Sequence, residues 1–194
     1  MPKLPRPPRR ATPDSFYRDY VPELWKSLPA APAAPESRAT ICIELPERSE
    51  RFTLNFEGTE VTVGTEPCDA PLLTVSSDYE SWKLACLDLL PRILKKLESW
   101  PETRRAPNPD RALRWASRPG GLEIELTDDA GDQARFSVRI GEGSARRAMI
   151  RATETDLWRL LEPGARLSSL LRSKLELDGD AGYPIQLAQL LESD

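Results

Sequence analysis

Few side chains in this chain are of the types that do chemistry, and none of them has a catalytic spacing. The 194 residues include no histidine, which excludes Ser-His-Asp and Cys-His catalysis, the common zinc ligand sets and the usual proton shuttle near neutral pH. The three cysteines, Cys42, Cys68 and Cys86, lack a CxxC spacing, so we expect reduced thiols. Neither GxGxxG nor a P-loop is present. We therefore predict a protein that is not an enzyme, with no catalytic residues, no metal and no cofactor.

The clusters of like charge have ordinary structural explanations. The acidic runs at 128–132 and 178–180 lack the ligand spacing of an EF-hand, and turn chemistry accounts for them. The pairs Arg104-Arg105 and Arg146-Arg147 could contact phosphate, but both have acidic neighbours and no aromatic side chains on which bases could stack. The net charge is −4, which gives no overall attraction to nucleic acid. We interpret both pairs as solvated surface and predict no nucleic-acid partner.

Proline content sets the first 36 residues apart from the rest. Nine of the 19 prolines fall within 1–36, and we expect 1–13 and 29–36 to be extended linkers. Between them, apolar residues at helical spacing predict a short helix, capped by Asp14 or Ser15 and kinked at Pro22. A tail, an aromatic helix and a tether are typical of a motif that docks on another protein. Its candidate partner-binding residues are Phe16, Tyr20, Leu24 and Trp25. Alternatively, the helix folds onto the first sheet of its own chain.

The remaining residues contain two cycles of strands followed by helices. Period-two patterns predict strands, and longer apolar periods predict helices. In the first cycle we expect strands at 39–45, 51–58, 60–65 and 70–76, then one or two helices within 77–100 with a break at Pro91. In the second we expect a helix at 110–117, strands at 121–129, 133–141 and 146–153, helices at 154–164 and 165–174, a strand at 175–180 and a helix at 183–192.

The matching order of elements in the two cycles indicates an internal duplication of one structural unit. The strand ICIEL is matched by LEIEL, and VSSDYESW is matched by RATETDLW. Trp82 and Trp158 lie 76 positions apart, close to the offset of the later helices, and we expect both to be buried at equivalent positions. We therefore divide the chain into an N-terminal segment (1–36), a first unit (37–101) and a second unit (102–194).

The second unit, clearest over residues 105–194, resembles the sterol carrier protein 2 (SCP2) fold. The resemblance rests on the hairpin GLEIELTDDAGDQARFSVRIG, the helix start from Thr153 to Asp156, and the final run LLRSKLELDGDAGYPIQLAQLL. Ser173 stands where the family usually has glycine just before its last strand. The first unit would be a degenerate copy that lacks the last strand and the terminal helix. The fold class this implies is α+β, with two tandem SCP2-like units whose antiparallel sheets are covered by helices.

SCP2-like domains generally hold a lipid or another apolar molecule in a tunnel between sheet and helices. The resemblance therefore implies a non-enzymatic protein that binds a hydrophobic, lipid-like ligand. The apolar helix faces supply its expected ligand-binding residues: Trp82, Cys86, Leu90, Ile93, Trp158, Leu161, Leu170, Ile185, Leu187 and Leu190. The same residues could instead form ordinary core. The alternative function is an accessory or adaptor subunit of a larger assembly that docks through residues 1–36 and holds no ligand.

The sequence also bears on location. No run of 18 or more apolar residues occurs, so we expect no integral membrane segment. The start MPKLPRPPRR is basic, but proline follows where a signal peptide needs its apolar stretch. We therefore expect a cytoplasmic protein.

Overall fold

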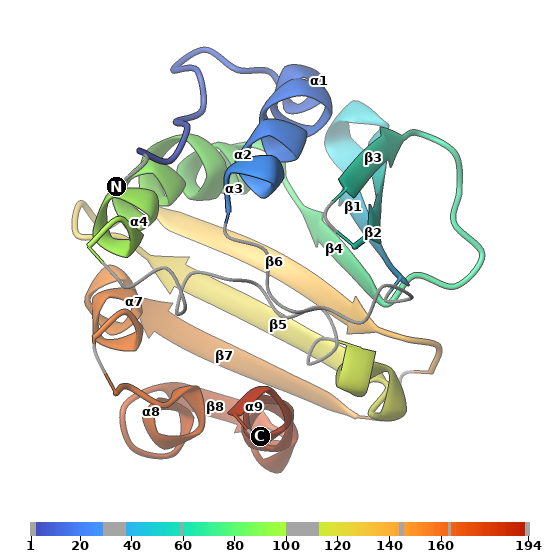
Figure 1. The fold of residues 1–194 in the computed structure, drawn as a ribbon. Coiled ribbons are helices and arrows are strands. Elements are labelled where there is room, and N and C mark those ends of the chain that lie inside the picture. The colour runs from blue at the N-terminus through green and yellow to red at the C-terminus, as the bar shows by residue number, and fades with distance from the viewer. Residues whose placement is uncertain are drawn as a thin grey trace.

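The computed structural model describes residues 3–28, 38–58, 60–99, 113–143, 146–162 and 164–192. The fold is α+β, as the sequence predicts, and its strands form one eight-stranded sheet in the order β3-β2-β1-β4-β6-β5-β7-β8 (Figure 1). The strands are β1 (Arg38–Leu45), β2 (Glu50–Glu57), β3 (Glu60–Gly64), β4 (Leu73–Ser77), β5 (Gly120–Thr127), β6 (Gln133–Ile140), β7 (Arg147–Thr153) and β8 (Glu176–Gly179). The predicted linker at 29–36 lies outside the described residues.

Each half has helices both before and after its first strands, and the helices of the two halves gather beside different ends of the sheet (Figure 1). At the N-terminus these are α1 (Pro13–Ser15), η1 (Phe16–Tyr20) and α2 (Val21–Ser27), with a short turn η2 (Pro46–Arg48) after β1. After β4 come α3 (Tyr79–Lys83), η3 (Leu84–Leu89) and α4 (Leu90–Leu97). The second half contains η4 (Arg114–Ser117), α7 (Glu154–Leu160), α8 (Leu167–Ser173) and α9 (Gly182–Glu192).

The expectation of separate sheets is wrong, because the two halves share one sheet. β4 of the first half pairs antiparallel with β6 of the second, from Leu73↔Ile140 to Ser77↔Phe136. Each half also has the same local strand order. β1 lies between its antiparallel hairpin partner β2 and the parallel strand β4, and β5 lies between β6 and β7 in the same way. A helix begins directly after β4 and after β7.

One face of this sheet is apolar on strand after strand, and the helices pack on that face. Pairs such as Ile43↔Phe52 and Leu122↔Ala148 place apolar side chains side by side on neighbouring strands. The buried residues form three clusters. The first joins β1–β3 to the N-terminal helices and α3–α4, the second joins β5–β7 to η4 and α9, and the third joins β5 and β6 to η3 and α7. The alternating residues on the opposite face are mostly polar.

Two interior prolines are accommodated without breaking their helices. A π-helical turn, η1 or η3, precedes each of Pro22 and Pro91, so the predicted break at Pro91 is wrong. Before Pro22, the Val21 N–H donates to the Phe16 carbonyl five residues earlier. Proline has no N–H to donate, and its ring clashes with the carbonyl four residues back. The wider π turn moves that carbonyl aside, so the helix continues past the proline.

The N-terminal residues 3–28, called here the N-terminal cover, pack against the rest of the chain. Leu4 is only 3% exposed, and its N–H donates to Glu98 Oε1 at 2.9 Å. Arg6 pairs with the same carboxylate at 2.8 Å, and the Tyr20 hydroxyl donates to the Pro5 carbonyl at 3.1 Å. The prediction of an extended linker is therefore wrong for residues 3–13. This proline-rich segment buries Leu4 and Ala11 almost completely.

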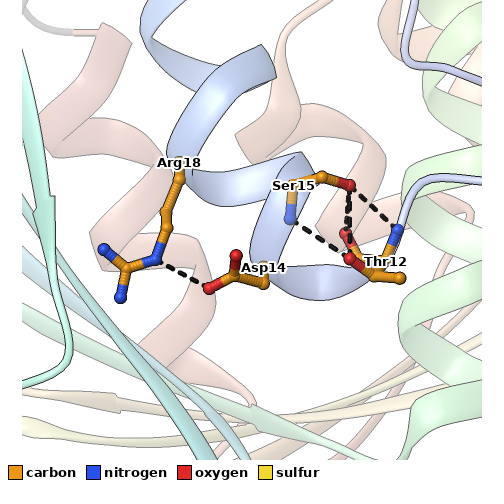
Figure 2. A network of polar contacts seen from close by, with 4 residues as sticks. All are labelled: Thr12, Asp14, Ser15 and Arg18. Carbon is orange, nitrogen blue, oxygen red and sulfur yellow. Dashed lines mark hydrogen bonds and ion pairs between the residues drawn. The ribbon is translucent and has the colours of Figure 1, made fainter.

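A cap at Thr12 starts the first helix of the cover. Thr12 and Ser15 each accept a hydrogen bond from the backbone N–H of the other, and Asp14 pairs with Arg18 at 2.7 Å (Figure 2). The predicted cap, Asp14 or Ser15, therefore lies two or three residues too late.

Candidate functional site

Trp82 lies at the centre of the region beneath the N-terminal cover. Asp78 caps α3 by accepting the Ser81 N–H at 2.6 Å, and this fixes the first turn of the helix directly after β4. Trp82 follows on that turn and is 1% exposed. Its ring meets Phe16 of the cover edge-on at 5.7 Å and stacks on Tyr79 at 5.5 Å. The cap and the cover together hold the indole in one orientation.

Three polar groups lie together at this position: the Trp82 indole N–H, the Tyr17 hydroxyl and the Cys86 thiol. Burial raises the pKa of Cys86 to about 12, and the Tyr17 hydroxyl opposes that rise. Burial and the nearby Cys86 raise the pKa of Tyr17 well above its usual value, while the Trp82 indole lowers it. Both groups are therefore neutral at physiological pH.

Among the residues that the structure describes, the buried indole N–H of Trp82 has no hydrogen-bond partner. The neighbouring Tyr17 hydroxyl interacts with the indole but does not have the geometry of a hydrogen bond to it. A buried, unpaired donor of this kind costs about 1–3 kcal/mol. An acceptor atom supplied by a bound molecule would remove that cost. Arg6 Nη1, in the cover itself, is a second buried donor without a partner.

Only part of the predicted ligand-binding set meets here. Trp82, Cys86 and Leu90 all pack in the first cluster, beneath the cover. Leu187 lies in the second cluster, beside Tyr183. The remaining predicted residues are half-buried: Ile93, Trp158, Leu161, Leu170, Ile185 and Leu190. The structure therefore does not bring the ten residues into one site, because the two groups of helices cover different ends of a single wide sheet.

Trp158 is not the counterpart of Trp82. Counting from the helix caps, Trp82 is four residues after Asp78, whereas the residue four after Thr153 is Leu157. Leu157 packs in the third cluster. Trp158 comes one position later, about 100° further round the helix, and is half-buried. The prediction that both tryptophans are buried at equivalent positions is therefore wrong. The two helix caps, Asp78 and Thr153, are 75 residues apart, whereas the two tryptophans are 76 residues apart.

The candidate partner-binding residues belong to the cover and pack within their own chain. Phe16 and Tyr20 are buried in the first cluster, and Leu24 and Trp25 pack against it from the side. Trp25 meets Phe56 of β2 with ring centres 4.8 Å apart. The segment therefore docks in cis, which is the second of the two arrangements that the sequence left open.

Sequence reasoning missed a cleft of about 620 Å³ between η3–α4 and the β5–β6 turn. Its lining residues are Leu84, Leu87, Asp88, Arg92, Asp128, Asp129, Ala130, Asp132 and Glu154. Glu154 is buried, pairs with Arg92 and accepts the Asp129 N–H at 3.2 Å. Among the described residues, no group of three or more Cys, Asp or Glu side chains is arranged to hold a metal ion. We interpret this cleft as a joint between the halves.

No family model, curated protein or solved structure matches this chain. Within the described part of the chain, no helix has the length and apolarity needed to cross a bilayer.

Proposed function

We propose that the protein is a non-enzymatic, SCP2-like binder of a hydrophobic ligand, held between the N-terminal cover and the helices after β4. The observation that carries this proposal is the buried Trp82 N–H without a partner. In the proposed complex the N–H donates to an oxygen of the ligand, while the aromatic and aliphatic residues of the first cluster contact its apolar body.

The chemistry of the three polar groups narrows the ligand class. Tyr17 and Cys86 are neutral, since the pKa of each is raised. A buried site whose donors around the indole are neutral accommodates a hydroxyl, ester or carbonyl oxygen better than an ionised carboxylate, because removing an ionised group from water costs far more than removing a neutral one. The ligand is therefore a neutral lipid, such as a long-chain alcohol or a sterol, rather than an ionised fatty acid.

Entry of this ligand requires the cover to move. Trp82 is only 1% exposed, so a ligand reaches its indole when the cover is displaced. Among the described residues, the polar contacts that anchor the cover to the rest of the chain are few: the Leu4 N–H and Arg6 both bind Glu98. The hydrogen bond from Tyr20 to the Pro5 carbonyl joins two residues of the cover itself. Loss of the apolar contacts between cover and helices is offset when the ligand makes equivalent contacts in their place.

Native mass spectrometry tests the proposal directly. The protein, incubated with dodecanol, dodecanoate or cholesterol, is expected to retain dodecanol or cholesterol and to release dodecanoate at neutral pH. Trp82→Phe keeps an aromatic ring but loses the donor, so it should lose the adduct; Trp158→Phe, at a half-buried tryptophan, should keep it. Melting curves confirm that both variants are folded. Absence of an adduct in the wild type, or equal retention in both variants, contradicts the proposal.

The adaptor function is the alternative, and it would require the cover to detach. Phe16 and Tyr20 are buried against their own chain, so a partner could use them only after displacing the segment.

We also interpret the two halves as an internal duplication. Two features support it: the shared order β2-β1-β4 and β6-β5-β7, and the helix after the third strand of each set. The copies differ at their outer edges, because β3 belongs to the first half, while β8 and α9 belong to the second.

A further inference from the structure

The sheet face without helices, called here the open face, carries arginines that differ in their pairing. Four of them have carboxylate partners: Arg38–Glu57 at 3.6 Å, Arg51–Glu44 at 3.0 Å, Arg135–Glu125 at 3.2 Å and Arg151–Glu176 at 2.7 Å. Two exposed arginines do not follow this pattern. Arg139 donates to the Thr74 hydroxyl at 3.3 Å, and the Arg147 side chain makes no hydrogen bond or ion pair within the described residues.

These two arginines flank a glycine. Arg139 of β6 and Arg147 of β7 are both register partners of Gly121 on β5, which lies between them. Their Cα atoms are therefore separated by two strand spacings, roughly 9.6 Å, which two arginine side chains can bridge. At Gly121 a Cβ would have Arg147 Cγ as its nearest neighbour, at 3.9 Å. The sheet surface between the two arginines is therefore bare backbone, and a side chain at position 121 would occupy that space.

We propose that Arg139 and Arg147 bind the phosphate group of a small phosphorylated molecule above Gly121. A guanidinium presents a planar fork of donors, and a tetrahedral phosphate offers oxygens to a fork on each side. A carboxylate presents its two oxygens on one side, so it can form a bidentate pair with only one guanidinium group. The Thr74 hydroxyl orients Arg139, and the missing side chain of Gly121 lets the phosphate approach the sheet. This site is on the opposite face from Trp82, so it is independent of the proposed function.

Two carboxylates lie near the site on the same face: Asp178 of β8, which is the register partner of Met149 two residues after Arg147, and Glu123. Glu123 is two residues after Gly121 on β5 and accepts a hydrogen bond from Ser137 at 2.9 Å. Its charge opposes anion binding from one side, which limits the site to a single phosphate group. Glu123→Gln is therefore expected to tighten binding.

Titration of the full chain with phenyl phosphate and with inorganic phosphate, at low salt, tests the proposal. Saturable binding is expected, with a loss of about tenfold or more in Arg139→Gln and in Arg147→Gln. Gly121→Val keeps both charges but occupies the space at position 121, and it should weaken binding similarly. Arg38→Gln removes an arginine that already has a carboxylate partner, and it should leave binding unchanged.

Three results would overturn the proposal: no saturable binding, equal loss in Arg38→Gln and Arg147→Gln, or full binding in Gly121→Val. The equal loss would mean that only overall charge matters. A further arm uses phosphatidylcholine vesicles with and without phosphatidic acid. Binding to the acidic vesicles without binding to either soluble phosphate would assign the face to a membrane and would also overturn the small-ligand site.

Discussion

Arg92 of α4 and Glu154 of α7 form an ion pair that joins the two halves of the chain across the cleft. Glu154 is 1% exposed and is the first residue of its helix, where the helix dipole favours a negative charge. It also accepts the backbone N–H of Asp129 in the β5–β6 turn. The ion pair thus adds a polar link among the helices to the β4–β6 pairing that joins the halves within the sheet.

Glu154→Gln should lower the stability of the protein. Removing the charge leaves the Arg92 guanidinium without its carboxylate partner, with its Nε–H still donating to the Asp88 carbonyl. Because Arg92 is also partly exposed, the cost should be about 1–3 kcal/mol rather than that of a fully buried pair. Urea denaturation measures the effect. Glu162→Gln, at an exposed position just after α7, is the matched control and should change little. Equal stability of the two variants would mean that the pair contributes nothing.

Gly120→Ala should be destabilising, whereas Gly121→Ala next to it should be tolerated. A Cβ at Gly120 would lie 2.6 Å from Cζ of the Tyr183 ring, which is fully buried and donates to the Arg118 carbonyl at 2.8 Å. At Gly121 the nearest atom is 3.9 Å from such a Cβ. We expect a loss of about 1–3 kcal/mol for Gly120→Ala from overpacking, measured by thermal melting. A melting temperature that falls equally in both variants would contradict the packing described here.

Leu4→Ala should reduce stability by about 2–5 kcal/mol, because Leu4 is buried in the first cluster although it lies near the chain start. Lys3→Ala, at the exposed neighbouring position, is the control. Chemical denaturation of both variants gives the comparison. If Leu4→Ala behaves like Lys3→Ala, the tail does not pack as described.

Part of the stability should be lost in acid through Asp156. Burial raises the pKa of Asp156, but hydrogen bonds from Thr153 and the charge of Arg159 outweigh burial and hold the pKa below its usual value. A folded-state pKa below the unfolded value contributes stability above pH about 4, and that stability disappears as the pH falls through the folded pKa. Asp156→Asn should therefore flatten the acid limb of the stability curve.

Asp19→Asn, at an exposed helical position, is the control for this pH dependence. A wild-type acid limb that is unchanged in Asp156→Asn would show that the cap does not contribute to it.

The strands and most helices could be predicted from the sequence because their signals are local. The alternation in β1, β5 and β6 and the Thr153 cap are properties of a few consecutive residues. Pairing between distant segments has no such signal. The β4–β6 pairing joins the two expected sheets into one, and the sequence pattern of neither strand indicates which strand it pairs with.

The candidate site could be predicted only in part, for the same reason. Helical spacing predicted Trp82, Cys86 and Leu90. Tyr17 belongs to a helix whose apolar pattern is the same whether it packs on its own chain or on a partner, so the sequence could not place it at this site. Leu4 and Arg6 have no periodic pattern at all, and their burial depends on the distant Glu98. The pairing of Arg92 with Glu154 likewise depends on how the two halves meet.

The resonance of the Trp82 indole N–H in a ¹⁵N–¹H spectrum tests the proposed function most directly. Trp82→Phe assigns the signal, and Trp115, whose N–H already donates to the Leu187 carbonyl at 3.1 Å, is the internal reference. On addition of dodecanol, a shift of the Trp82 resonance and slower hydrogen exchange at that site are expected, with Trp115 unchanged. A Trp82 resonance that stays in place at saturating dodecanol, or one that moves together with Trp115, would contradict a ligand held by the indole beneath the N-terminal cover.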